Sequence, residues 1–261
     1  MNSLIRADNV LEVIGRSHDG LSHTEIHHLF PMPKSSLSRL LASLVSLQYI
    51  LVDRKRKRYK LGSRLLTLAG KYLAGMDIFQ IGRDYVIQLS KITNETATLA
   101  IPGIQDAILI AIENVPQNII KPPHIGDHMP MYATAAGKAI LAHMSEKEID
   151  RYFSSVTLEA ITPHTITDEQ KLRKELQKIR KGEFAYSWQG FREHVVAIGA
   201  PVFNVNNQVI ASLSISILSL DAKPNKLNQL KKFLAKVVNE FSLRLGYEAS
   251  DLQSSIPELG I

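Results

Sequence analysis

The positive charge of this chain lies almost entirely in its first quarter. Met1–Lys71 holds 12 Lys and Arg against 5 Asp and Glu, whereas Tyr72–Ile261 holds 19 against 20. With 261 residues, the chain is long enough for two domains of ordinary size. A basic segment joined to a neutral one is typical of a nucleic-acid-binding module followed by a second domain. We therefore expect two domains, the first of which binds DNA or RNA.

The chain contains no cysteine. This excludes a disulfide framework, an iron–sulfur site and a thiol nucleophile, and it fits a reducing compartment. Val195–Leu220 has no charged residue, but Gly199, Pro201 and the polar run 204–208 divide it. We therefore expect two buried strands around a turn there, and not a membrane span. Because the N-terminus has no apolar block of signal-peptide length, we expect a cytoplasmic protein.

Residues 1–62 have the element order of a winged helix-turn-helix domain. An apolar stripe predicts a first helix that ends near Gly20. Ser22 and Glu25 have the spacing of a capping box, which predicts a second helix to about Phe30. Prolines then interrupt the chain, and a third helix follows from about Lys34. The side chains expected to face the core are Ile26 and Leu29 of the second helix and Leu37, Leu40, Leu41, Leu44 and Leu47 of the third.

The third helix and the hairpin after it carry the candidate DNA-binding residues. The outer face of the helix is small and polar with one arginine, which suits a major groove about 12 Å wide. The hairpin joins strands at 49–53 and 58–61 through a run of like charges, and a row of phosphates would relieve their repulsion. The candidates are Lys34, Ser35, Ser36, Ser38 and Arg39 on the helix and Arg54, Lys55, Arg56, Lys57 and Arg58 on the hairpin.

Each of these signals has a plainer interpretation when taken alone. A basic run is usually a solvated turn, and a leucine-striped helix is usually core. Their occurrence in the correct order within 45 residues favours double-stranded DNA. An RNA-binding module is disfavoured because no aromatic stacking platform accompanies the hairpin. The other alternative is a small-molecule-processing enzyme with a basic association segment. No G-x-S-x-G, P-loop or G-x-G-x-x-G motif is present, so we expect no catalysis.

Beyond the hairpin we expect a linker helix over residues 63–76, a second domain over 77–248 and a tail over 249–261. The apolar face of the linker helix is too narrow to fold alone, which favours packing against a partner chain. The second domain interleaves strands with helices and is therefore a mixed α/β domain. Expected strands are 96–101, 107–113, 183–188, 195–203 and 209–217. Expected helices are 77–92, 133–144, 145–153 (capped by Ser145 and Glu148), 167–181 (capped by Thr167 and Gln170) and 225–245.

Three motifs of the chain resemble segments of the IclR (isocitrate lyase regulator) family of bacterial transcription factors. Met129–Ala142 is similar to "P-L-x-A-T-A-x-G-K-A-x-L-A", and Ala197–Phe203 with Val209–Ser216 to "I-A-A-P-V-F-D … A-x-L-S-V-S". Pro33–Leu41 is similar to the recognition helix of the family. The resemblance implies an α+β protein with a winged helix-turn-helix, a linker helix and a GAF-like effector-binding domain. It also implies dimers or tetramers on palindromic operators and a small, often carboxylate-bearing, effector.

The resemblance places the effector pocket at Ala135, Ala136, Ser214 and Ser216. An acidic residue of the family's pocket falls on Ser187 here, and a nearby glutamate falls on Gln189, so the pocket is less acidic. The residues agree in part, because Ser212, Ser214 and Ser216 share one face of a strand. Free N–H groups of the helix near Ala133 would suit an anion. The alternative is that these serines mark a half-exposed strand.

The histidines give no clear metal site. His23 and His27 stand four apart on one helix, and His124, Asp127 and His128 cluster in a loop. Neither group offers a third and fourth ligand, so we expect surface histidines, no metal and no cofactor. Trp188, the sole tryptophan, is expected in the core or in the wall of the pocket.

Overall fold

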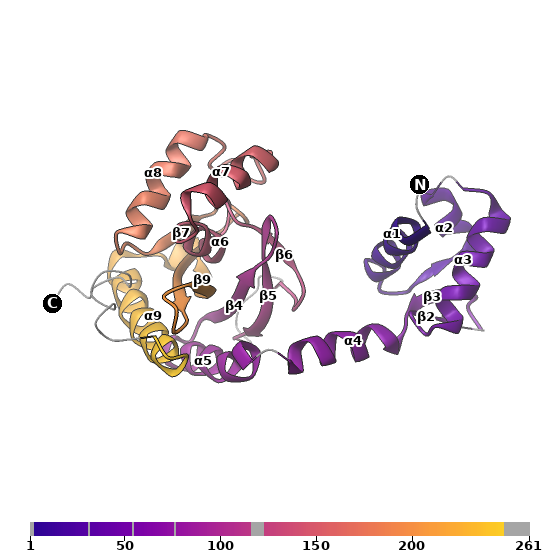
Figure 1. The fold of residues 1–261 in the computed structure, drawn as a ribbon, viewed down its shortest axis with the longest axis horizontal. Coiled ribbons are helices and arrows are strands. Elements are labelled where there is room, and N and C mark those ends of the chain that lie inside the picture. The colour runs from indigo at the N-terminus through magenta and orange to yellow at the C-terminus, as the bar shows by residue number, and fades with distance from the viewer. Residues whose placement is uncertain (1–2, 31, 54, 76, 116–122, 248–261) are drawn as a thin grey trace. The chain divides into compact units, whose positions relative to one another are not determined.

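The computed structural model describes residues 3–30, 32–53, 55–75, 77–115 and 123–247. The chain divides into two compact units, Met1–Asp77 and Ile78–Ile261 (Figure 1). Within the described ranges, no helix combines the length and apolar character needed to cross a membrane. The expected tail at 249–261 and the hairpin residue Arg54 lie outside the described residues.

The first unit packs helices α1 (Ser3–Gly15), α2 (His23–Leu29) and α3 (Lys34–Ser46) against a small antiparallel sheet. Its strands are β1 (Leu21–Ser22), β2 (Ile50–Asp53) and β3 (Arg58–Leu61), in the order β1-β3-β2. The Ser22–Glu25 capping box predicted for α2 is present. The buried core consists of Val10, Ile14, Ile26, Met32, Leu37, Leu41, Leu44 and Ile50. Helix α4 (Ser63–Ala74) follows the hairpin and has no buried residue.

Two leucines predicted for this core are exposed. Leu29 is the last residue of the seven-residue helix α2 and is 56% exposed. Leu47 is 59% exposed because α3 ends at Ser46 and Leu47 is its C-terminal cap. The 3.6-residue period that places both leucines on an inner face applies only while the helix continues. Strand β1 was not predicted, since two residues are too few for an alternating pattern.

The second unit is built on one antiparallel sheet in the order β6-β5-β4-β9-β8-β7. The strands are β4 (Thr96–Pro102), β5 (Asp106–Glu113), β6 (His128–Pro130), β7 (Ala185–Trp188), β8 (Val195–Phe203) and β9 (Val209–Leu218). Figure 1 shows helices α6 (Ala135–Leu141), α7 (Glu146–Ser155) and α8 (Glu169–Arg180) on one side of this sheet. Helices α5 (Asp77–Thr93) and α9 (Pro224–Arg244) lie on the other, and a short 3₁₀ turn (Ser219–Asp221) precedes α9.

Because helices cover both sides of the sheet, side chains on both faces of β9 can be buried. Leu213 and Ile215, on one face of the strand, are buried, and so are Ser212 and Ser214 on the other. The half-exposed strand considered for the alternating serines is therefore wrong. Serines that are buried in a sheet require polar partners, so their surroundings matter for function.

The helix caps of this unit follow the predicted chemistry with one exception. Ser145 and Glu148 form the expected capping box of α7. The box predicted from Thr167 and Gln170 is wrong, because Asp168 caps α8 by accepting a hydrogen bond from the backbone N–H of Lys171. A carboxylate is an equally good N-cap and can also interact with the helix dipole, which moves the start of the helix by one residue.

Candidate functional site

The outer face of α3 presents the residues predicted to read DNA. Lys34, Ser35, Ser38 and Arg39 are exposed, and Ser36 is half-buried. The Ser38 hydroxyl donates to the carbonyl of Lys34 at 2.9 Å and lies 3.0 Å from Nε2 of His23. Ser38 therefore links α2 to α3 as well as facing outward. Arg39 projects from the same face and is its one arginine.

The first turn of α3 is open at its N-terminus. Pro33 is the N-cap, and its carbonyl accepts hydrogen bonds from the N–H groups of Ser36 and Leu37. No side chain among the described residues caps this turn. Unpaired N–H groups at the start of a helix suit a phosphate, and Lys34 adds a positive charge beside them.

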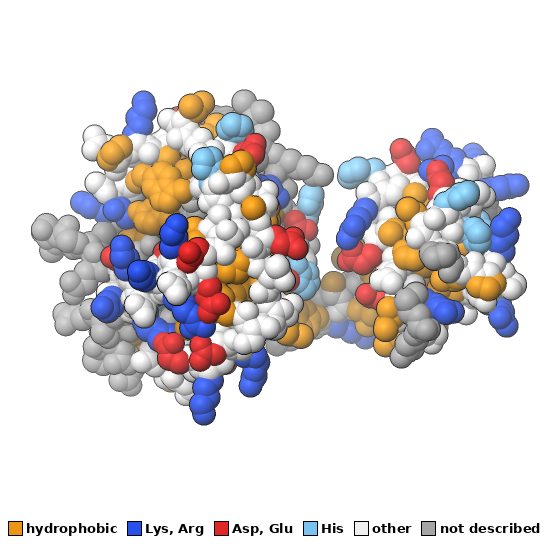
Figure 2. Space-filling model, turned by 90° about the horizontal axis from the view of Figure 1, so that it is seen from above, with side chains coloured by type: hydrophobic (Ala, Val, Ile, Leu, Met, Phe, Trp, Pro, Cys, Tyr) orange, Lys and Arg blue, Asp and Glu red, His pale blue; other side chains and the backbone are white. Residues whose placement is uncertain are grey.

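The hairpin between β2 and β3 holds its basic residues outward. Asp53 shapes the turn, because its Oδ1 accepts the backbone N–H groups of Lys55 at 2.9 Å and Arg56 at 3.1 Å. The hydrogen bond from Arg56 is the main reason that the pKa of Asp53 is lowered. Lys57 takes a left-handed conformation with φ of 52°. Lys55, Arg56 and Lys57 are exposed, and Figure 2 shows Lys and Arg side chains standing out from the smaller unit.

Arg58 differs from the other basic residues of the hairpin. Its Nε donates to the carbonyl of Gly20 at 3.0 Å, and its Nη2 donates to Glu25 Oε1 at 3.0 Å. Glu25 also accepts the backbone N–H of Ser22, which is the main cause of its lowered pKa. Arg58 thus joins the hairpin to the start of α2. In the described part of the basic run, the cationic side chains directed at solvent are therefore Lys55, Arg56 and Lys57.

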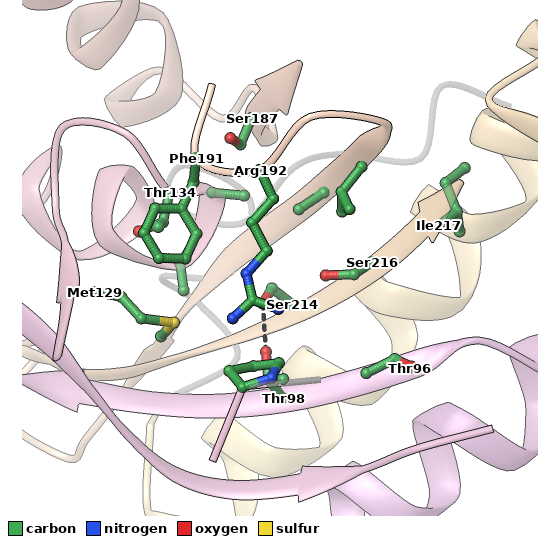
Figure 3. Close-up of a pocket in the computed structure, with 15 residues that line it drawn as sticks. Thr96, Thr98, Met129, Thr134, Ser187, Phe191, Arg192, Ser214, Ser216 and Ile217 are labelled. Carbon is green, nitrogen blue, oxygen red and sulfur yellow. Dashed lines mark hydrogen bonds between the residues drawn. The ribbon is translucent and has the colours of Figure 1, made fainter. Parts of the chain in front are cut away.

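The second unit contains a pocket between α6, the sheet and the loop after β7 (Figure 3). The empty space of the pocket and its mouth, open solvent included, is about 780 Å³. Each position that the resemblance assigned to the effector lines this pocket: Ala135, Ala136, Ser187, Ser214 and Ser216. The structure adds lining residues that we did not predict, among them Thr96, Thr98, Phe191 and Arg192.

Hydroxyl groups form the floor of the pocket. Strand β4 pairs with β9 so that Thr96 lies opposite Ser216 and Thr98 opposite Ser214. The hydroxyls of Thr98 and Ser214 are 2.7 Å apart and hydrogen-bonded. The Ser187 hydroxyl donates to the carbonyl of Ala133 at 2.6 Å, so its oxygen remains as an acceptor. Period-two alternation of Thr96 and Thr98 was the sequence signal that could have identified them.

The small residues at the start of α6 are explained by close packing on the sheet. A Cβ atom at Gly199 of β8 would lie 2.7 Å from the carbonyl oxygen of Ala135. Ala135 and Ala136 are almost fully buried and form the apolar wall of the pocket. Lys138 points elsewhere, because its Nζ donates to Glu175 and to the carbonyl of Tyr186, both at 2.8 Å. The Ser212 hydroxyl is also engaged elsewhere, donating to Ala200.

The remaining polar candidates do not assemble into a site. Among the described residues, no group of three His, Asp or Glu side chains has metal-binding geometry. His128 lies 3.5 Å from Asp106, and His124 lies 3.9 Å from Asp127, as exposed pairs. Trp188 was expected in the core or the pocket wall, which is wrong. It is 51% exposed on the edge strand β7 and stacks on Tyr186.

A helix-turn-helix unit with a basic hairpin, joined to a domain with a ligand-sized pocket, defines a ligand-responsive transcriptional regulator. The family model described as bacterial transcriptional regulator IclR C-terminal matches residues 70–243, and that of the IclR helix-turn-helix domain matches residues 3–54. The chain therefore belongs to the IclR family of bacterial transcriptional regulators.

Relatives and solved structures cover nearly the whole chain. The regulator XynR of Escherichia coli is 27% identical over 249 residues, which are 95% of this chain and 99% of XynR. The Thermotoga maritima IclR structure is 30% identical with a TM-score of 0.79, covering 95% of this chain and 100% of that one. An IclR homologue from Microbacterium hydrocarbonoxydans, solved in complex with 4-hydroxybenzoate, has the same fold at 19% identity, with a TM-score of 0.79 and coverage of 94% and 99%.

Proposed function

We propose that α3 reads base edges in the major groove while the hairpin binds the phosphate backbone. Arg39 is the specificity residue, with Ser35, Ser36 and Ser38 around it. Lys34 and the basic run Arg54–Arg58 bind phosphates, and Arg58 does so least because Gly20 and Glu25 already hold it. One observation carries this proposal: the exposed outer face of α3 and the exposed basic side chains of the hairpin belong to the same small unit.

We further propose that the chain acts in the cytoplasm as a dimer or tetramer on palindromic operators. The support is indirect: helix α4 has exposed apolar side chains such as Leu66 and Tyr72, which suit a partner chain. A two-fold assembly would place two copies of α3 on inverted half-sites. We propose no catalytic role, since the relatives are transcriptional regulators.

The pocket of the second unit is proposed to bind a small organic or aromatic carboxylate that modulates DNA binding. The bound 4-hydroxybenzoate of the structural neighbour supports this ligand class. Helix α4 precedes the second unit along the chain, and we propose that ligand binding alters the spacing of the two recognition helices through it. Couplings of this kind are typically worth about 1–3 kcal/mol.

Salt dependence of binding to duplex DNA tests the proposed function. With about six phosphates bound, log K should fall with log salt at a slope of roughly −5. Replacing Lys55, Arg56 and Lys57 by alanine should make the slope shallower by about 0.9 for each phosphate that is no longer neutralised, or about 3 in all. Electrophoretic mobility shifts over a salt series, made without any ligand, measure both slopes.

A variant with the exposed lysines of α8 (Lys171, Lys174 and Lys178) replaced by alanine removes the same charge from the second unit. It should keep the wild-type slope. No binding to duplex DNA at low salt would favour the alternative, an enzyme whose basic segment serves association only.

A further inference from the structure

Arg192 is the one charged side chain among the described residues that line the pocket. None of the described lining residues carries a carboxylate, and Ser187 occupies the position at which the family resemblance implies an acidic residue. In Figure 3 the Arg192 side chain extends from the loop after β7 toward the middle of the lining residues. A single cationic group inside a mainly apolar cavity attracts an anion and repels a cation.

Several hydroxyls of the pocket already have hydrogen-bond partners. The Ser187 proton is directed at Ala133, and the Thr134 hydroxyl donates to Pro130 while it accepts from Gly137. The bonded pair of Thr98 and Ser214 leaves one hydroxyl proton between the two. A guanidinium carries five N–H donors in a planar fork, which matches the two oxygens of a carboxylate and leaves donors for other contacts.

The backbone that carries Arg192 is fixed on several sides. The Thr162 hydroxyl donates to the carbonyl of Gln189 at 2.7 Å, and the Thr165 hydroxyl donates to that of Gly190 at 2.6 Å. The Gln189 side chain accepts the N–H of His194 at 3.0 Å, so it closes the loop and does not line the pocket. These hydrogen bonds hold the loop in place before a ligand binds, so the loop loses less conformational entropy on binding.

Apolar side chains line the pocket together with Arg192. Phe191 is half-buried, and its ring centroid lies 5.6 Å from Cζ of Arg192, within reach of a cation–π contact. Met129, Val195 and Ile217 line the pocket with the two alanines of α6. The cavity therefore combines an apolar wall for a ligand's body with one cation, carried on a fixed loop backbone, for its charged end.

We propose that Arg192 determines the specificity of the pocket by binding the carboxylate of a compact monoanionic ligand with an apolar body. The proposal rests on the proposed effector role of the pocket and names the residue that selects the ligand's charge. The hydroxyl pair of Thr98 and Ser214 lies on the floor, where it can donate to the same carboxylate or to a second polar group of the ligand. A neutral ligand of the same shape loses the charge-assisted hydrogen bonds and binds more weakly.

Isothermal titration calorimetry on the full chain tests this with acid and amide pairs that share one body. The probes are benzoate and benzamide, 4-hydroxybenzoate and 4-hydroxybenzamide, and hexanoate and hexanamide. In at least one pair the acid should bind about tenfold to a hundredfold more tightly than the amide. Arg192→Met, which retains length and apolar character, should remove this difference, and Arg192→Lys should restore part of it. Arg151→Met, at an exposed arginine of α7, should leave the difference intact.

The proposal is overturned if no acid of the panel binds, if each amide binds as tightly as its acid, or if Arg192→Met retains the preference for the acid. Its failure is separable from that of the proposed function. DNA binding and its salt slope are measured without ligand. A chain that binds DNA but prefers neutral ligands would therefore contradict only the role proposed for Arg192.

Discussion

Replacing Arg39 by alanine is expected to reduce the preference for cognate over scrambled duplex DNA by about 5- to 150-fold. A bidentate contact from arginine to a guanine edge discriminates against the wrong base by about 1–3 kcal/mol. Arg39 is the exposed arginine of α3, between small side chains that allow the helix to approach the bases closely. Cognate sequences are obtained by selecting bound duplexes from a randomised library, and dissociation constants are then compared for selected and scrambled duplexes.

The matched control is Arg16→Ala. Arg16 is an exposed arginine of the same unit, paired with Glu12 of α1, and it lies off the recognition face. That variant should keep the wild-type preference. An Arg39→Ala variant that lost affinity equally for selected and scrambled duplexes would show that Arg39 contacts phosphates, and the assignment to base reading would be wrong.

Gly137→Ala is expected to destabilise the second unit by about 2–4 kcal/mol. A Cβ atom at Gly137 would lie 2.3 Å from Cα of Met131 and 2.7 Å from its carbonyl oxygen. Because these are backbone atoms, α6 would have to move away from the segment before it, and every residue of α6 is buried. Overpacking of this kind usually costs about 1–3 kcal/mol, and the rigid neighbours place this position at or above that range.

Tryptophan fluorescence during thermal unfolding measures this effect selectively, because Trp188 is the sole tryptophan and lies in the second unit. The midpoint should fall by roughly 5–15 °C. Gly70→Ala is the control, since an added Cβ there meets no atom within 4 Å and α4 gains helix propensity. An unchanged midpoint for Gly137→Ala would contradict the close packing that shapes the pocket wall.

Elements with local chemical signals were predictable from the sequence. The capping boxes at Ser22 and Ser145 fix helix starts through contacts three residues apart, and both are present. Errors arose where neighbouring residues compete for one role, as when Asp168 replaced Thr167 as the cap of α8. Leu29 and Leu47 were misplaced because periodicity does not reveal where a helix stops.

The pocket was only partly predictable because tertiary structure assembles it. The residues of α6 and β9 were found through a family resemblance, and all line the cavity. Arg192 lies on an irregular loop, where no periodicity indicates which way a side chain points. Thr98 reaches the site only through the pairing of β4 with β9, strands separated by more than a hundred residues. The family resemblance therefore identified part of the pocket's lining but missed its charged group.

Recovery of genomic fragments tests the central claim, sequence-specific binding to operators, most directly. The full chain is mixed with fragmented DNA of its host, and the bound fragments are sequenced. The proposed assembly predicts that enriched fragments share an inverted repeat whose half-sites are about 10 base pairs apart, or a multiple of that spacing. Enriched fragments with no common sequence would contradict it, since binding would then rest on phosphate contacts alone.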